Sequence, residues 1–240
     1  MSSGWLVRAA VLPLAAAQSR GGMRLPAASL SGCCSGVCLR PRCGRFLVCH
    51  GVAYDATLRS AWRAKMLVVL SGLPGTGKTT IGKALATRRA ATYVRVDEIE
   101  HALMQGANLG RDIGPTGYLI AFAIASSNLK IGNLVIGDSV NPVPESRNGW
   151  RNVANGLDCP VLDVEVICTD ESEHRRRVEA RDGDIVGFEL PTWASVKARD
   201  YTPWTEDRLV LDTAVLNPDD AVAQIEARID ILTKQAIADP

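Results

Sequence analysis

A glycine-rich stretch, SGLPGTGKTT at residues 71–80, holds the residue types that bind a phosphate group. Gly72, Gly77, Lys78 and Thr79 fit the pattern G-x-x-x-x-G-K-[ST]. Glycines allow the backbone to turn its N–H groups toward an anion, and the positive dipole end of a following helix favours the same anion. We therefore expect this stretch to bind the phosphates of ATP. The candidate binding residues are Gly72, Leu73, Pro74, Gly75, Thr76, Gly77, Lys78, Thr79 and Thr80.

Charged and hydroxyl side chains around this stretch suggest more specific roles. Lys78 is placed to reach the β- and γ-phosphates, and the Thr79 hydroxyl to bind Mg²⁺. Asp97 and Asp138 each close a predicted strand. Because ligands of open α/β sheets bind at the carboxyl ends of the strands, both carboxylates should converge with the phosphates. We assign Asp97 as the general base for an attacking hydroxyl, and Asp138 as the residue that helps Thr79 to hold Mg²⁺.

Both carboxylates also have a structural interpretation. Asp97 precedes the helical pattern EIEHAL and could serve only as the N-cap of that helix. An acid after a hydrophobic strand, as at Asp138, is a common and unspecific pattern.

An arginine-rich segment, DESEHRRRVEAR at residues 170–181, supplies further candidates. Arg177 and Arg181 are four residues apart and share a helix face beside a Gly-containing loop at 182–187. Phosphoryl transfer needs cations that arrive with the substrate and exclude water, so we expect these two arginines to contact ATP from a mobile lid. The alternative is a solvated helix face, which is the usual place of a charge run.

Histidine and aromatic side chains are expected to be structural. We interpret His101 and His174 as surface residues. Trp193, Tyr201 and Trp204 are interpreted as core anchors of the lid segment rather than as platforms for a base.

Strand and helix patterns alternate from Met66 onward. The predicted strands cover residues 66–71, 91–97, 133–139, 160–169 and 207–213. The predicted helices cover residues 79–90, 98–106, 118–131, 144–157, 170–181 and 218–234. This alternation predicts a three-layer α/β fold with a five-stranded parallel sheet, to which the arginine-rich segment adds an Arg-bearing lid. The helix at 118–131 is apolar nearly all round, which predicts full burial.

The chain divides into two parts of different composition. Residues 1–65 hold eight Arg and one Lys against Asp55, a net charge of about +8, together with five of the seven Cys. Residues 66–240 hold 18 basic and 25 acidic residues, about −7. Because the first part shows no sustained period, we expect a disordered N-terminal extension at 1–65 and a single phosphate-binding domain at 66–240.

The N-terminal part leaves several interpretations open. An Arg-rich, acid-poor start is typical of an organelle presequence, and AAVLPLAAAQS at 9–19 weakly resembles an export signal. A true start at Met66 would instead make residues 1–65 an artefact of the gene model. A zinc site is not favoured, because no C-x-x-C pair is present. Without such a signal we expect a cytoplasmic protein, since only Cys159 and Cys168 fall in the second part.

Length and charge limit the partners. No apolar run reaches 18 residues, which excludes a membrane-spanning helix. The charge of about −7 on residues 66–240 argues against a nucleic-acid acceptor, which would need a basic groove. We expect a small-molecule partner with a hydroxyl group, and a monomer or homodimer.

The motifs MLVVLSGLPGTGKTTIGKALA, VRVDEIEHAL, NLVIGDSVNPVPESR, CTDESEHRRRVEAR and PTWASVKARDYTPW together resemble a bacterial family of small P-loop kinase-like proteins, often labelled AAA-family ATPases or ATP-binding proteins. That family is similar to adenylyl-sulfate kinases, gluconate kinases, polynucleotide kinases, chloramphenicol phosphotransferases and zeta toxins. The resemblance covers residues 66–235 and implies the nucleoside-kinase-like fold of a P-loop NTPase. It implies that residues 72–80 bind ATP and Mg²⁺, that Asp97 lies near the acceptor hydroxyl and Asp138 near the metal, and that Arg177 and Arg181 belong to a lid.

The chain differs from the hexameric ATPases that the label suggests, because it has no acidic D-E pair after its third strand and no arginine-finger region. A kinase with a hydroxyl acceptor is therefore the first hypothesis, and a regulator that binds ATP and hydrolyses it slowly or not at all is the second. The acceptor is expected between residues 98–106, the loop at 107–117 and SVNPVPESR at 139–147. Within the last segment Asn141 and Arg147 offer polar contacts, and Arg147 suggests an anionic acceptor.

Overall fold

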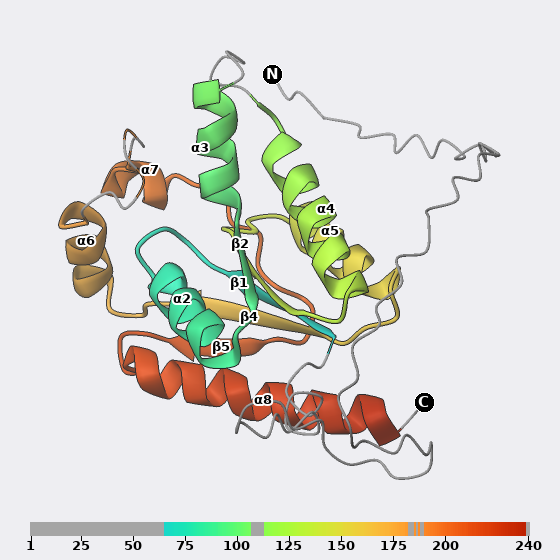
Figure 1. Ribbon diagram of the computed structural model, residues 1–240. Helices are drawn as coiled ribbons and strands as arrows, with labels where there is room; N and C mark the ends of the chain where they lie inside the picture. Colours follow the sequence, from blue (N-terminus) through green and yellow to red (C-terminus); the bar gives the residue numbers. More distant parts are fainter. Residues whose placement is uncertain (1–64, 107–112, 182–184, 186, 188–189, 239–240) are drawn as a thin grey trace, which may run out of the picture. The chain divides into compact units, whose positions relative to one another are not determined.

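The computed structural model describes residues 65–106, 113–181, 185, 187 and 190–238 (Figure 1). The predicted extension at 1–65, except Lys65, lies outside the described residues. So do residues 107–112 of the predicted acceptor loop and most of the predicted lid loop at 182–187.

Five parallel strands form one sheet, as the sequence predicts. They are β1 (Met66–Ser71), β2 (Thr92–Arg95), β3 (Leu134–Asp138), β4 (Val161–Ile167) and β5 (Leu209–Asp212). Their order across the sheet is β2-β3-β1-β4-β5. The strand that precedes the glycine-rich stretch is therefore central, and β2 and β5 are the two edges.

Seven helices of the described residues connect and cover the strands. They are α2 (Lys78–Arg89), α3 (Val96–Gly106), α4 (Thr116–Lys130), α5 (Pro144–Asn155), α6 (Glu171–Glu179), α7 (Trp193–Lys197) and α8 (Pro218–Ala238). The second strand ends earlier than predicted, because the chain is helical from Val96. Asp97 and Glu98 lie in the first turn of α3, where acidic side chains interact favourably with the helix dipole.

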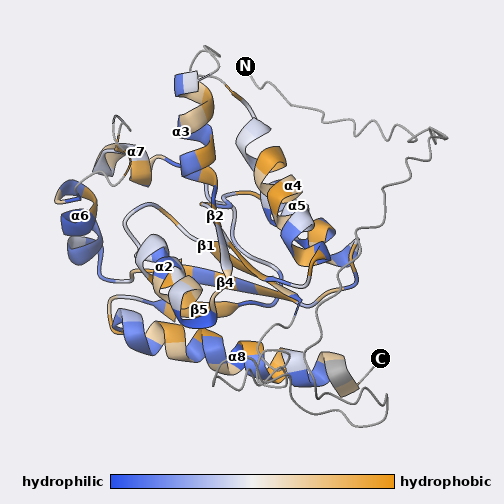
Figure 2. Cartoon of the chain, in the orientation of Figure 1, coloured by the Kyte–Doolittle hydropathy of each residue, from blue (hydrophilic) through white to orange (hydrophobic). Residues whose placement is uncertain are grey.

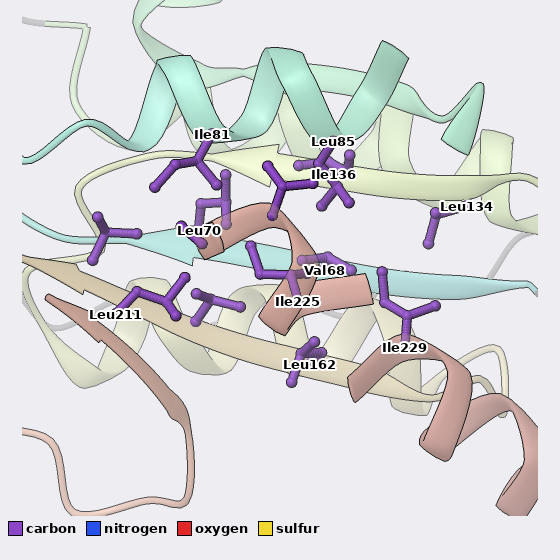
Figure 3. Packing of buried hydrophobic residues seen from close by; sticks show 14 of the residues in the cluster. Val68, Leu70, Ile81, Leu85, Leu134, Ile136, Leu162, Leu211, Ile225 and Ile229 are labelled. Atoms are coloured by element: carbon purple, nitrogen blue, oxygen red, sulfur yellow. The ribbon is translucent and has the colours of Figure 1, made fainter. Parts of the chain in front are cut away.

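Helices α2 and α8 cover one face of the sheet (Figure 1). Figure 3 shows their contact with the sheet, where Ile81 and Leu85 of α2 and Ile225 of α8 pack in one cluster with Leu70 and Val68 of β1. All six residues of β1 are buried, since alternate side chains enter the cores on the two faces. This packing fixes the start of α2 one short loop after the central strand.

Helices α4 and α5 cover the opposite face. Helix α4 buries Gly117, Ala121, Ala125 and Leu129, a stripe with a four-residue spacing. The prediction that this helix is buried all round is wrong, because Leu119 is 60% exposed on its outer side. The helix is the outermost layer on this face, so one side meets solvent even though its sequence is apolar.

No helix among the described residues combines the length and the apolar character needed to cross a membrane.

Candidate active site

The glycine-rich stretch forms a loop between β1 and α2. Gly72 has a φ of +140° and Gly77 a φ of +97°, backbone conformations that residues with a Cβ rarely adopt. A Cβ on Gly72 would lie 2.2 Å from the carbonyl oxygen of Val166, so this position is also closed by sterics. The loop ends at the first turn of α2, whose free N–H groups and dipole favour an anion.

Two side chains from later elements hold this loop in place. His174 Nε2 lies 2.8 Å from the carbonyl oxygen of Pro74 and donates to it, since a carbonyl can only accept. The Thr213 hydroxyl donates to the carbonyl oxygen of Thr76 at 2.9 Å. The interpretation of His174 as a surface residue is wrong, because its side chain is buried between the loop and the ring of Trp193. A charged, exposed helix surrounds His174 in the sequence and conceals that it faces inward.

Lys78 is the first residue of α2, and its side chain folds back into the glycine-rich loop. Its Nζ donates to the carbonyl oxygen of Leu73 at 2.9 Å, and the side chain is buried. Burial lowers the pKa of Lys78, while the carboxylates of Asp138 and Asp97 act in the opposite direction. A phosphate bound in the loop would give the buried Lys78 ammonium an anionic partner.

Thr79, Asp138 and Tyr93 form a partly buried group of oxygen atoms next to the glycine-rich loop. The Thr79 hydroxyl donates to Asp138 Oδ2 at 2.9 Å, and the Tyr93 hydroxyl donates to the same oxygen at 2.5 Å. Asp138 is the last residue of β3 and only 2% exposed. Burial and the neighbouring Asp138 raise the pKa of Tyr93, which keeps its hydroxyl a donor.

These oxygens fit Mg²⁺, which prefers hard oxygen ligands and retains several of its waters. Among the described residues no group of three or more His, Cys, Asp or Glu side chains could enclose a metal ion. A Mg²⁺ ion at Thr79 would therefore take most of its ligands from phosphates and water, with Asp138 holding the Thr79 hydroxyl.

Asp97 is the second residue of α3 and points into the same region. Its Oδ2 lies 3.6 Å from Nη2 of Arg95, a side chain that is 1% exposed, and Asp97 itself is 36% exposed. Since α3 begins at Val96, Asp97 lies within the first turn rather than before it. The structure therefore places Asp97 inside the helix and not at the N-cap.

One cleft of about 470 Å³ joins these groups. It is lined by Pro74, Gly75, Gly77, Lys78, Thr79, Thr80, Asp97, Glu100, Val140, Arg177, Arg181, Pro191 and Arg199. The predicted residues Lys78, Thr79 and Asp97 thus share one space with both predicted arginines, while Asp138 reaches it through Thr79. Sequence reasoning missed Glu100, although its position three residues after Asp97 on a helix was a usable signal. Arg199 carried no such signal.

The arginines of the 170–181 segment have different surroundings. Arg177 donates to Glu173 at 2.7 Å and to the hydroxyl and carbonyl oxygens of Thr213 at 2.9 and 3.0 Å, which fixes its guanidinium at the cleft wall. Arg181 lies beyond the end of α6 and also lines the cleft. Arg175 pairs with Glu179 on the exposed side. Figure 2 shows how hydrophilic α6 is along its length, so only part of its charge reaches the cleft.

A smaller hollow of about 200 Å³ adjoins the cleft on the β5 side. Its lining residues are Gly77, Thr80, Ile81, Arg177, Thr213, Leu216 and Pro218. It shares Gly77, Thr80 and Arg177 with the cleft. Three of its other lining residues, Ile81, Leu216 and Pro218, are apolar.

The predicted acceptor contacts Arg147 and Asn141 lie away from this cleft. Arg147 is 1% exposed and donates to the carbonyl oxygens of Asn141, Pro142 and Thr202, and its guanidinium lies 4.2 Å from the ring centroid of Trp204. Asn141 is fully buried as well. The structure corrects both assignments. Arg147 donates to backbone carbonyl oxygens, while the Asn141 amide donates to the Ser71 hydroxyl and its oxygen accepts from the Ser139 hydroxyl. The interpretation of Trp204 as a core anchor agrees with its burial.

Known proteins resemble the chain in sequence and in fold. The model of the family described as "AAA domain" matches residues 67–199. No curated protein matches the chain.

Solved structures of three kinases share the architecture. The APS kinase of Mycobacterium tuberculosis in complex with AMPPNP and APS is 19% identical, with a TM-score of 0.55 over 70% of this chain and 98% of that one. A gluconokinase of Sinorhizobium meliloti is 17% identical, with a TM-score of 0.52 over 72% and 96%. A sugar kinase of Janibacter sp. is 19% identical, with a TM-score of 0.50 over 71% and 97%. The chain therefore has the fold of P-loop kinases.

Proposed function

This chain belongs to the AAA domain family, and we propose that it is an ATP- and Mg²⁺-dependent kinase that transfers the γ-phosphoryl group to a hydroxyl of a small molecule. The observation that carries the proposal is the single cleft in which the Lys78 loop, the Asp97 carboxylate and two arginines meet. The proposed kinase domain is residues 66–240. The fold shared with three solved kinases supports this reading.

The strand order of the sheet indicates which end of the cleft would hold the nucleotide and which would hold the acceptor. The hollow at Thr213 lies at the end of β5, the glycine-rich loop follows the central β1, and Asp97 follows β2 at the other edge. The apolar hollow suits a nucleotide base, and the loop suits its phosphates. The acceptor then belongs at the β2 edge, beside Asp97.

In the proposed reaction the Asp97 carboxylate accepts the proton of the acceptor hydroxyl as the hydroxyl oxygen attacks the γ-phosphorus. The bond between the γ-phosphorus and the bridging oxygen breaks, and ADP leaves with that oxygen. Arg95, buried and 3.6 Å from Asp97, holds the carboxylate in position.

Cations of the chain stabilise the charge that develops on the transferred group. Lys78 from the loop and Arg177 and Arg181 from the arginine-rich segment line the cleft around the expected place of the γ-phosphate. Thr79, oriented by Asp138, would hold Mg²⁺, which would supply further positive charge to the phosphates.

ATP consumption by the full chain tests the proposal. The purified protein and its Asp97→Asn variant are compared without acceptor and with pools of neutral sugars, amino sugars, sugar acids, nucleosides and adenylyl sulfate. We expect one pool to stimulate ADP formation, and Asp97→Asn to lower that rate at least a hundredfold while ATP still binds. Asp207→Asn, at an exposed position outside the cleft, is the matched control and should leave the rate unchanged.

The opposite result would contradict a kinase. If no pool stimulates turnover, and Asp97→Asn equals the parent protein while both bind ATP, the site holds a nucleotide without transferring its phosphoryl group. The protein would then be a nucleotide-dependent regulator.

A further inference from the structure

A second carboxylate lies on the acceptor side of the cleft. Glu100 is on α3, three residues after Asp97, so the two side chains occupy the same helix face, and both line the cleft. The mechanism above gives Glu100 no role. Because Glu100 lies next to the proposed general base Asp97, it should also lie next to the acceptor whose hydroxyl that base deprotonates.

The structure makes room for this side chain. A Cβ on Gly117 of α4 would lie 2.3 Å from Cγ and 2.9 Å from Oε1 of Glu100. Glu100 therefore extends across Gly117 toward the cleft, and any larger residue at 117 would displace it. Such a close approach holds the carboxylate in one direction.

The Glu100 carboxylate has no partner of its own in the part of the chain that the structure describes. No hydrogen bond or ion pair there reaches it, whereas Glu98, two residues away, pairs with Arg95 at 3.5 Å. Burial and the charge of Asp97 raise the pKa of Glu100 to about 7, while the attraction of Arg199 acts against them. A partly buried carboxylate with these surroundings is most stable when a donor from outside the chain binds it.

We infer that Glu100 binds the acceptor, and that the acceptor carries a second hydrogen-bond donor, a hydroxyl or an ammonium group, close to the hydroxyl that receives the phosphoryl group. This inference rests on the proposed kinase function and adds the class of acceptor to it. An anionic group at this position would face Asp97 and Glu100 together, with Arg199 as the cation that acts on Glu100 there. Neutral polyols and amino sugars fit the site, and sugar acids do not.

Three six-carbon acceptors that differ mainly in charge test the inference. The full chain is assayed with glucose, glucosamine and glucuronate, together with the wider pools of each class, and kcat and KM are measured for each acceptor that is phosphorylated. We expect activity with the neutral or the amine-bearing class. Glu100→Gln should raise the KM for that acceptor about tenfold to a hundredfold with little change in kcat, because it weakens a binding contact rather than the proton transfer. Glu145→Gln, at an exposed position outside the cleft, should change neither value.

The amine-bearing and the neutral acceptors distinguish an ammonium donor from a hydroxyl donor. A preference for glucosamine-type acceptors that Glu100→Gln removes assigns an ammonium to the site, and an equal response with neutral sugars assigns a hydroxyl. Phosphorylation confined to anionic acceptors, or an unchanged KM in Glu100→Gln, would overturn the role of Glu100 while leaving the kinase intact. No transfer to any class, with ATP binding retained, would overturn the kinase proposal and the inference with it.

Discussion

The hydroxyl of Thr79 donates to Asp138 Oδ2 at 2.9 Å, which joins the first turn of α2 to the last residue of β3. These residues are 59 positions apart in the chain, and they meet because β1 and β3 are neighbouring parallel strands. The contact orients the hydroxyl that is proposed to bind Mg²⁺.

Asp138→Asn should therefore weaken the use of Mg²⁺. The amide keeps the size of the side chain but loses its charge, so we expect the Mg²⁺ concentration for half-maximal activity to rise at least tenfold. A Mg²⁺ titration of ATP consumption and of ATP binding checks this. Tyr93→Phe is the control, since it removes the other hydroxyl on Asp138 and keeps the carboxylate. Equal titrations for Asp138→Asn and the parent protein would count against a metal role.

His174→Phe should loosen the glycine-rich loop. The ring still packs against Trp193, but the carbonyl oxygen of Pro74 loses its donor. We expect a loss of about 1–3 kcal/mol in the free energy of unfolding, and weaker ATP binding in a calorimetric titration. The exposed Arg175→Ala change on the same helix should affect neither quantity. If ATP binds His174→Phe as tightly as the parent protein, the hydrogen bond does not position the loop.

Arg147→Met should destabilise the fold without altering the chemistry. Four backbone carbonyl oxygens lose a buried donor, which we expect to lower the free energy of unfolding by about 3 kcal/mol in urea denaturation. Acceptor KM in the fraction that remains folded should be unchanged, since Arg147 lies outside the cleft. A specific rise in acceptor KM would instead restore the anionic-acceptor interpretation of this arginine.

Stability should fall as pH rises from about 5 to about 7, in part because of Glu100. In the folded protein its pKa is about 7, above the ordinary value of 4.5, so in this interval the folded state holds a proton that the unfolded state has lost. The charged groups that act on it are Asp97, which raises the pKa, and Arg199, which lowers it. Solvent reaches part of the side chain, so we expect an effect of about 1–2 kcal/mol.

Urea denaturation at pH 5 and pH 8 measures this dependence. Glu100→Gln has no titrating group at this position, so its loss of stability between the two pH values should be smaller than that of the parent protein by that amount. Other titrating groups are common to both proteins and cancel in the comparison. Identical pH dependence in the two proteins would contradict the raised pKa.

Local patterns in the sequence predicted most of the fold. The residues of β1 form a continuous apolar run before the glycine-rich stretch, and Asp138 ends a short apolar strand, so both could be placed without knowledge of distant contacts. The sheet order could not be obtained in this way, since it depends on which strands pair.

The residues that sequence reasoning misjudged owe their surroundings to contacts between distant segments. His174 is buried by a loop 100 residues earlier, and Arg147 by carbonyl groups from residues 55 positions later. Glu100 enters the cleft because Gly117 on another helix leaves space for it. Charge and helical spacing alone do not distinguish such residues from an exposed surface.

The two halves of the cleft come from different parts of the chain. The proposed nucleotide side is built by the loop after β1, by Arg177 and by Thr213, whereas the proposed acceptor side is built by α3 at one edge of the sheet and by Arg199. For the proposed kinase we therefore expect mutations in α3 to change which molecule is phosphorylated without disturbing the residues that hold the nucleotide. In evolutionary terms, such a division would let new acceptor preferences diverge on an unchanged phosphate donor site, and directed evolution of this protein should begin with α3.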